Sequence, residues 1–290
     1  MNPVATPLRS RTVVRGAAIL AAAGFTALLP PVAHADQFYA TQILSRTLGS
    51  PSQSGFQDTN DILGGPSGDP NTGGSTHVLN LGVGGNVTLG FDSTDGLTRR
   101  NITNGDGADF IVFENAFYAG TDTTKSFAEL VFVEVSSNGT DFARFPTLSL
   151  TPSAVGPFGT INPANVSGFA GVHPVLANVD TNSINPFDST VAGGDAFDLS
   201  SLGSNALVLS GKVDLNAIRY LRLIDVVGDG TLLDSVGHAI YDPTGSGSGG
   251  ADIDSVAVIH GATPEPGSGL VGFAGMMWML RRRTVKGAGQ

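Results

Sequence analysis

Short β-prone runs separated by Gly, Asn, Asp and Ser fill the chain between two apolar segments near its ends. Helical periodicity is nearly absent between those segments, so a helical bundle is a poor match to this chain. The run over 86–91 alternates, which places Val87, Leu89 and Phe91 on one face of an expected strand. Many short strands with few helices predict an all-β fold, an antiparallel two-sheet sandwich.

Seven further runs carry a strand pattern. They span residues 38–45, 77–81, 109–115, 127–136, 141–145, 217–227 and 253–260. Asn138-Gly139 predicts a tight hairpin turn between two of these strands. Residues 151–190 are rich in Pro, Asn and Gly and predict an ordered excursion, anchored by three aromatic residues: Phe158, Phe169 and Phe187. Residues 193–202 predict a single helical turn after a Gly-Gly break.

The first 35 residues have the layout of a secretory signal peptide. Three arginines precede an apolar core over residues 16–29: Arg9, Arg11 and Arg15. Ala33 and Ala35 fit the small-x-small cleavage rule, so we expect the mature chain to begin at Asp36. The chain contains no cysteine, which excludes a lipoprotein anchor, disulfides and thiolate chemistry.

Three ordered elements form the C-terminus: Pro264-Glu265-Pro266, an apolar stretch over 267–280, and Arg281-Arg282-Arg283. The apolar stretch is shorter than the roughly 20 residues of a comfortable bilayer span, and the arginines resist translocation. This arrangement resembles the PEP-CTERM sorting signal of exported bacterial proteins. The resemblance implies export through the Sec translocon, transient membrane insertion, recognition by an exosortase, and a final place at the cell surface or in the extracellular matrix.

These end segments divide the chain into a signal peptide (1–35), a β-sandwich domain (36–263) and a sorting signal (264–290). The domain has 24 acidic and eight basic residues, a formal charge of −16. Such a charge repels phosphate backbones and anionic membranes, so nucleic acid is excluded as a partner. It attracts divalent cations, and Asp, which supplies 21 of the acids, is favoured in turns and in calcium loops.

Six aspartates are candidate calcium ligands: Asp106, Asp109, Asp195, Asp198, Asp252 and Asp254. Asp252 and Asp254 alternate around Ile253, so both side chains are expected on one side of a strand. Asp195 and Asp198 are three residues apart and are expected on one side of the helical turn. Calcium is therefore the expected cofactor. The alternative that these carboxylates cap turns and accept backbone N–H bonds stays open.

Two stretches of the domain resemble discoidin-type, galactose-binding-like jelly rolls. Residues 133–145 (VEVSSNGTDFARF) resemble their strand–turn–strand unit, with Phe142 in place of the usual Trp, and residues 217–223 (AIRYLRL) resemble a second strand. The resemblance implies a sandwich of jelly-roll type and carbohydrate recognition. Tyr118 and Tyr241, both expected in loops, are the candidate aromatic platforms for a sugar ring.

The sequence offers little for catalysis. Asp109 and Glu114 are five residues apart and face opposite sides of a regular strand, which argues against a glycosidase pair. Glu114 lies in an apolar run and needs a metal or a cationic partner, for which three arginines are available: Arg144, Arg219 and Arg222. We therefore expect a non-catalytic structural or adhesive protein of an exopolysaccharide-rich envelope. A carbohydrate-binding module for exopolysaccharide is the first alternative, and a secreted hydrolase is the second.

Overall fold

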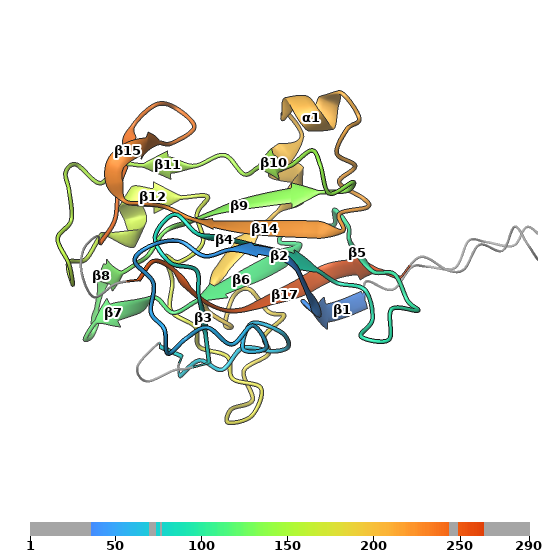
Figure 1. The fold of residues 1–290 in the computed structure, drawn as a ribbon, viewed down its shortest axis with the longest axis horizontal. Helices are drawn as coiled ribbons and strands as arrows, with labels where there is room; N and C mark the ends of the chain where they lie inside the picture. The colour runs from blue at the N-terminus through green and yellow to red at the C-terminus, as the bar shows by residue number, and fades with distance from the viewer. Residues whose placement is uncertain (1–35, 70–73, 76, 244–248, 264–290) are drawn as a thin grey trace, which may run out of the picture. The chain divides into compact units, whose positions relative to one another are not determined.

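The computed structural model describes residues 36–69, 74–75, 77–243 and 249–263. The predicted signal peptide and sorting signal, with Ala33, Ala35, the Pro264-Glu265-Pro266 motif and Arg281–Arg283, lie outside the described residues. None of the helices in the described ranges has the length and hydrophobicity that a bilayer span requires. The described part is mostly antiparallel β-structure, which confirms the predicted all-β fold (Figure 1).

Two antiparallel sheets form the sandwich (Figure 1). In the six-stranded sheet the order is β1 (Asp36–Tyr39), β17 (Asp252–Ala262), β6 (Phe110–Glu114) and β13 (Asp195–Phe197), while β3 (Leu79–Asn80) and β5 (Asn101–Ile102) also pair with β17. In the five-stranded sheet the order is β10 (Ala143–Arg144), β9 (Val131–Ser136), β14 (Tyr220–Asp225), β4 (Asn86–Gly90) and β2 (Gln42–Thr47).

Smaller elements surround the sandwich. Three two-stranded sheets pair β7 (Phe117–Ala119) with β8 (Asp122–Phe127), β11 (Leu148–Ser149) with β12 (Val166–Ser167), and β15 (Asp229–Leu233) with β16 (Ala239–Tyr241). The helices of the described residues are the short 3₁₀ turns η1 (Pro163–Asn165) and η2 (Leu199–Leu202) and the single α-turn α1 (Ala206–Leu209).

The expected strand over 38–45 is in fact two strands that belong to different sheets. The amide of Ala40 bonds to the carbonyl of Val256 in β17, whereas the amide of Thr41 bonds to the carbonyl of Gly90 in β4. The chain therefore passes from the six-stranded sheet to the five-stranded sheet between these two residues. β1 and β2 each lie at one end of the strand order of their sheet. No Gly or Pro interrupts residues 38–45, so the sequence gives no local signal of this crossing.

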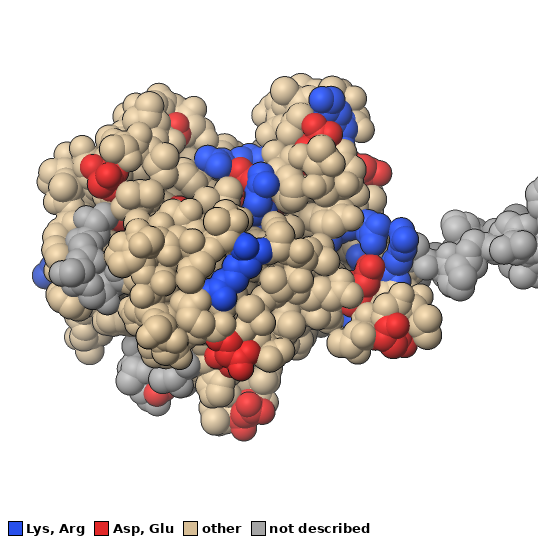
Figure 2. Space-filling view, in the orientation of Figure 1, with Lys and Arg blue, Asp and Glu red and all other residues tan. Residues whose placement is uncertain are grey.

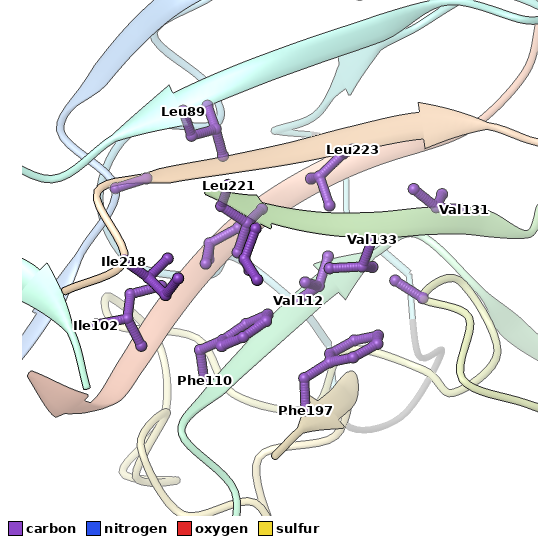
Figure 3. Packing of buried hydrophobic residues seen from close by; sticks show 14 of the residues in the cluster. Leu89, Ile102, Phe110, Val112, Val131, Val133, Phe197, Ile218, Leu221 and Leu223 are labelled. Atoms are coloured by element: carbon purple, nitrogen blue, oxygen red, sulfur yellow. The ribbon is translucent and has the colours of Figure 1, made fainter. Parts of the chain in front are cut away.

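Side chains from the two sheets meet in one core (Figure 3). Leu89, Leu221 and Val133 of the five-stranded sheet and Phe110 and Val112 of the six-stranded sheet are fully buried. Full burial of a side chain of this kind stabilises the fold by about 1.5–3 kcal/mol. The alternation read over residues 86–91 is confirmed, since Val87, Leu89 and Phe91 all belong to this core.

The turn at Asn138-Gly139 is also confirmed. Gly139 has a φ of +77°, a conformation that glycine adopts without strain. The Asn138 side-chain oxygen accepts hydrogen bonds from the amides of Thr140 and Asp141, which closes the connection between β9 and β10.

The excursion over 151–190 is ordered, as predicted, and it covers the outer faces of the sheets. Phe169 is buried against Phe132 of β9, and Phe187 stacks on Tyr39 with ring centroids 4.8 Å apart. The expectation for Phe158 was wrong, because its side chain is 73% exposed and its φ is +60°. Phe158 lies in a Gly-Pro-Phe-Gly turn, where the backbone direction holds the ring away from the sheets.

Candidate functional site

A groove with a volume of about 840 Å³ lies beside β13, the last strand of the six-stranded sheet. Its walls come from β7, β12, β13 and the excursion, and from the residues that follow β10. Pockets of about 300–1,000 Å³ are typical of small-ligand sites. The main polar side chains of the lining are Tyr118, Ser167, His173, Asp195 and Asp198.

Tyr118 provides the aromatic ring of the groove. It lies in β7, opposite Ser126 of β8, so the prediction that it occupies a loop was wrong. Stacking of Phe117 on Phe127, with centroids 4.7 Å apart, supports the same hairpin. The ring is half-buried, and burial followed by the negative charge of Asp195 raises the pKa of Tyr118. The hydroxyl group therefore stays protonated and can donate a hydrogen bond at neutral pH.

His173 and Asp195 form the charged pair of the groove. Nδ1 of His173 lies 2.7 Å from Oδ1 of Asp195, while Oδ2 of Asp195 accepts hydrogen bonds from the amides of Val172 and His173. The carbonyl of Val172 accepts a further bond from the hydroxyl of Ser126 in β8. The amide and the carbonyl of Val172 are thus both hydrogen-bonded, and these two bonds fix the position of the neighbouring His173 imidazole.

This pairing sets the protonation of His173. The hydrogen bond to Asp195 raises the pKa of His173, although burial opposes the shift. A carboxylate only accepts hydrogen bonds, so Nδ1 carries the proton and Nε2 is left for another partner. The side chain is 49% exposed, and Nε2 can therefore meet a ligand in the groove.

Asp195 and Asp198 both line the groove, but they do not lie on one helical turn as predicted. Asp195 belongs to β13, where it pairs with Val112 of β6. Asp198 is the N-cap of η2, and its side chain accepts a hydrogen bond from the amide of Ser200. A short strand and not a helical turn follows Gly193-Gly194. Its side chains alternate as in a strand, with Asp195 and Phe197 buried and Ala196 exposed.

Tyr241, the second predicted platform, lies outside the groove. It is part of β16 and not of a loop, and its half-buried ring packs over Gly230 in the neighbouring strand β15. Gly230 has a φ of +85°, and a side chain there would collide with the ring. Tyr241 therefore closes its own hairpin.

The other predicted metal ligands are separated in the fold. Asp106 is exposed, whereas Asp109 is fully buried and accepts hydrogen bonds from the amides of Gly105 and Leu199 and from Nδ1 of His260. Burial raises the pKa of Asp109 against these hydrogen bonds. Its carboxylate joins three segments that are far apart in the sequence.

Asp252 and Asp254 also have different partners. The Asp252 carboxylate accepts a hydrogen bond from the side chain of Asn80, and the Asp254 carboxylate accepts from the amide of Ser67. The pairing of β17 with β6 shifts register between Ile253 and Ser255, which interrupts the expected alternation. Among the described residues, no group of three or more Asp, Glu or His side chains is close enough to hold a metal ion by itself.

The expectation that an arginine pairs with Glu114 was wrong. Arg144 and Arg222 both bind Glu134 on the outer face of the five-stranded sheet, and Arg219 binds Asp92. Figure 2 shows the basic side chains of the visible face in small groups, some with acidic side chains beside them. Glu114 lies at the end of β6, 2% exposed and away from these pairs.

Comparison of the chain with protein-family models, with curated proteins and with solved structures finds no match. The groove itself is therefore the guide to function. Sequence reasoning selected Tyr118 and Asp195 but missed His173, because the His173–Asp195 contact joins residues 22 positions apart through an irregular loop. No local spacing signals such a contact.

Proposed function

We propose that this chain is an exported, non-catalytic cell-surface or matrix protein whose β-sandwich, of jelly-roll type, binds a neutral sugar of the surrounding exopolysaccharide. Calcium, in this proposal, stabilises the domain. The observation that carries the proposal is the half-buried ring of Tyr118 in one groove with the fixed His173–Asp195 pair. A partly exposed aromatic ring beside a concave polar surface is the feature that favours glycan binding over a purely structural role.

The chemistry of the groove suits a sugar. An aromatic ring packs against the apolar C–H face of a pyranose, and polar groups around it bond to the hydroxyl groups. Tyr118 supplies the ring and a hydroxyl donor, and His173 offers Nε2. Because Asp195 fixes His173 before any ligand arrives, little side-chain entropy is lost on binding.

Charge argues for a neutral ligand. The domain carries a formal charge of −16, and two aspartates line the groove. An anionic polymer such as a uronate-rich polysaccharide would be repelled over the whole surface, most strongly at low ionic strength. We therefore assign the groove to neutral hexose-type sugars.

The two carboxylates of the groove are the one feature that favours a hydrolase, because glycosidases use paired carboxylates. In this groove the Asp195 carboxylate accepts hydrogen bonds from two backbone amides and from the imidazole of His173. The Asp198 carboxylate accepts a hydrogen bond from the first turn of η2. Both carboxylates thus have structural partners, which supports binding without turnover. Release of reducing ends from a bound polysaccharide, lost in an Asp195→Asn variant, would favour the hydrolase instead.

The route out of the cell is proposed from the two end segments. Their resemblance to a signal peptide and to a PEP-CTERM signal implies processing by signal peptidase and by an exosortase. Mass spectrometry of the chain recovered outside the cell tests this. We expect an N-terminus at Asp36 and a C-terminus that lacks the arginine block, whereas recovery of the intact 290-residue chain would contradict the proposal.

The binding proposal is tested by calorimetric titration of the chain with neutral and with anionic oligosaccharides. We expect binding of a neutral oligosaccharide only, and a loss of affinity of about tenfold or more in Tyr118→Ala because the stacking surface disappears. Tyr241→Ala is the matched control, since Tyr241 lies outside the groove. Equal affinity of the wild-type chain and Tyr118→Ala, both folded, would overturn the assignment of the groove.

A further inference from the structure

Five acidic side chains gather at the end of the sandwich where β6 and β14 finish and β9 and β17 begin. They are Glu114, Glu129, Asp225, Asp242 and Asp252. Figure 1 shows β7, β8 and β15 at this same end. Through the described part of the chain, none of the five forms an ion pair with Lys, Arg or His. A group of buried carboxylates without a positive partner is costly to maintain.

Glu114 gives the sharpest sign that a partner is needed. Its residue is 2% exposed, and Oε1 accepts a hydrogen bond from the amide of Asp252. Oε2 is buried and has no hydrogen-bond partner among the described residues. A buried carboxylate oxygen with no donor beside it needs a proton or a cation.

The surroundings of this oxygen supply more acceptors and no donor. A Cβ placed on Gly171, whose φ is +81°, would collide with the carbonyl oxygen of Glu129 and would lie 3.3 Å from Oε2 of Glu114. These two oxygens therefore lie near one point, beside a residue that has no side chain. The carbonyl of Glu129 and its carboxylate also lack a hydrogen-bond donor within the described ranges.

The other three carboxylates are oriented by backbone and side-chain donors. Asp225 accepts hydrogen bonds from the amides of Gly84 and Ala251, and Asp242 accepts from the amide of Leu130, next to Glu129. Burial, then the negative charges of Asp252 and Asp225, raises the pKa of Glu129 to about 8. Burial also raises the pKa of Asp225 to about 7. The group is thus electrostatically coupled and lacks a positive charge.

We infer that a divalent cation of the calcium class binds here, between the carboxylate of Glu114 and the carbonyl and carboxylate of Glu129, with Asp252 and Asp242 beside it. The inference rests on the proposed role of calcium and gives that role a position. Since no three Asp, Glu or His side chains of the described ranges are close enough to hold an ion alone, the two glutamates share it with the backbone carbonyl and water. Calcium accepts such mixed oxygen sets of six to eight ligands, whereas magnesium demands a tighter octahedron.

The position of the site ties it to the groove. Gly171 lies against the two glutamates, and the next residues, Val172 and His173, are the ones bound by Asp195. An ion here would therefore hold the segment that forms one wall of the groove. Of the aspartates selected from the sequence, only Asp252 belongs to this site.

The test is thermal unfolding of the full chain in about 10 mM calcium and in EGTA, because extracellular calcium modules bind with Kd values of about 0.1–1 mM. We expect calcium to raise the melting temperature by about 3–10 °C. The shift should disappear in Glu114→Gln and in Glu129→Gln, since each variant removes a carboxylate that would bind the ion. Asp106→Asn, an exposed aspartate away from the site, is the control and should keep the full shift.

Each outcome decides something different. A calcium shift that survives in both glutamine variants overturns this site but leaves calcium as a stabiliser. Absence of any shift in the wild-type chain overturns both the site and the calcium role, and leaves sugar binding by the groove untouched. If a variant does not fold, NMR of the wild-type chain decides, because calcium must move the amide signals of Gly171 and Asp252.

Discussion

Buried aspartates act as connectors between distant segments of this chain. Asp109, Asp195, Asp225, Asp234 and Asp242 each accept a hydrogen bond from the backbone of another part of the fold. A chain without cysteine has no disulfides to make such connections, and a charge-assisted hydrogen bond is the stronger of the non-covalent options. The short Asp side chain reaches a backbone amide with little loss of side-chain entropy.

Asp234 is the clearest case for a pH experiment. Burial would raise its pKa, but hydrogen bonds from the amides of Ser149, His238 and Val236 outweigh burial and lower the pKa to about 2. A carboxylate whose pKa is lowered in the folded state contributes stability above its unfolded pKa of about 3.9, and that contribution is lost as pH falls through about 2. Asp234→Asn should therefore destabilise the chain at neutral pH by about 1–3 kcal/mol.

Chemical unfolding of the wild-type chain and of Asp234→Asn, at neutral pH and near pH 2, measures the difference in their free energies of unfolding. The gap in stability between wild type and Asp234→Asn should narrow over the window from about pH 4 to pH 2. Asp180→Asn, at an exposed position, serves as control and should stay within about 0.5 kcal/mol of wild type. If the difference in unfolding free energy between wild type and Asp234→Asn stays constant over that window, the charge of Asp234 does not contribute to the stability of the fold.

At the scale of elements, three aromatic rings attach β13 to the rest of the sandwich. Phe197 of β13 stacks on Phe110 of β6 with centroids 5.3 Å apart, and it meets Phe145, which follows β10, edge-on at 4.9 Å. Phe145 and Phe197 also line the groove. The same rings therefore contribute to the core and to the floor of the candidate site.

Phe197→Ala should reduce the free energy of unfolding by about 3–5 kcal/mol, because it removes a ring that is 4% exposed and leaves a cavity beneath the groove. Denaturant unfolding measures the change. Phe158→Ala provides the matched comparison: the same substitution at a ring that is 73% exposed should change stability by about 0.5 kcal/mol at most. Similar losses in the two variants would mean that the aromatic cluster does not hold β13.

Elements with a clean local pattern were predictable from the sequence. The alternation at Val87 and Leu89, the apolar run of β6 and the turn at Gly139 depend on residues that are neighbours in the chain. Elements defined by a distant partner were missed, including β13, which exists because it pairs with β6, and the passage from β1 to β2. Pairing between distant segments has no signature within a short window.

The candidate site follows the same division. Tyr118 was selected because it was expected in a loop, although it lies in β7, and Asp195 was selected because Asp198 follows three residues later. His173 and Glu129 were not singled out, since each acquires its role only through contacts with segments distant in the sequence. The predicted arginine partner of Glu114 was wrong because all three candidate arginines are bound elsewhere.

At the scale of the whole molecule, the described part begins and ends at one place. Asp36 pairs with Gly261, so the first and last strands, β1 and β17, lie side by side in the six-stranded sheet. A new N-terminus at Asp36 would leave this pairing intact, which fits removal of a signal peptide at that point. The excursion meanwhile covers both outer faces and builds the groove at the β13 edge. In the proposed function, export depends on the two end segments and binding depends on the groove, which are separate parts of the chain.

The most direct test of this account is NMR mapping of a neutral oligosaccharide on the isotope-labelled chain. We predict chemical-shift changes at the amides of Tyr118, His173 and Asp198, with the signals of Tyr241 and its hairpin unchanged. Changes centred on the β15–β16 hairpin, or no changes at any neutral sugar concentration, would contradict the claim that the groove beside β13 is a sugar-binding site.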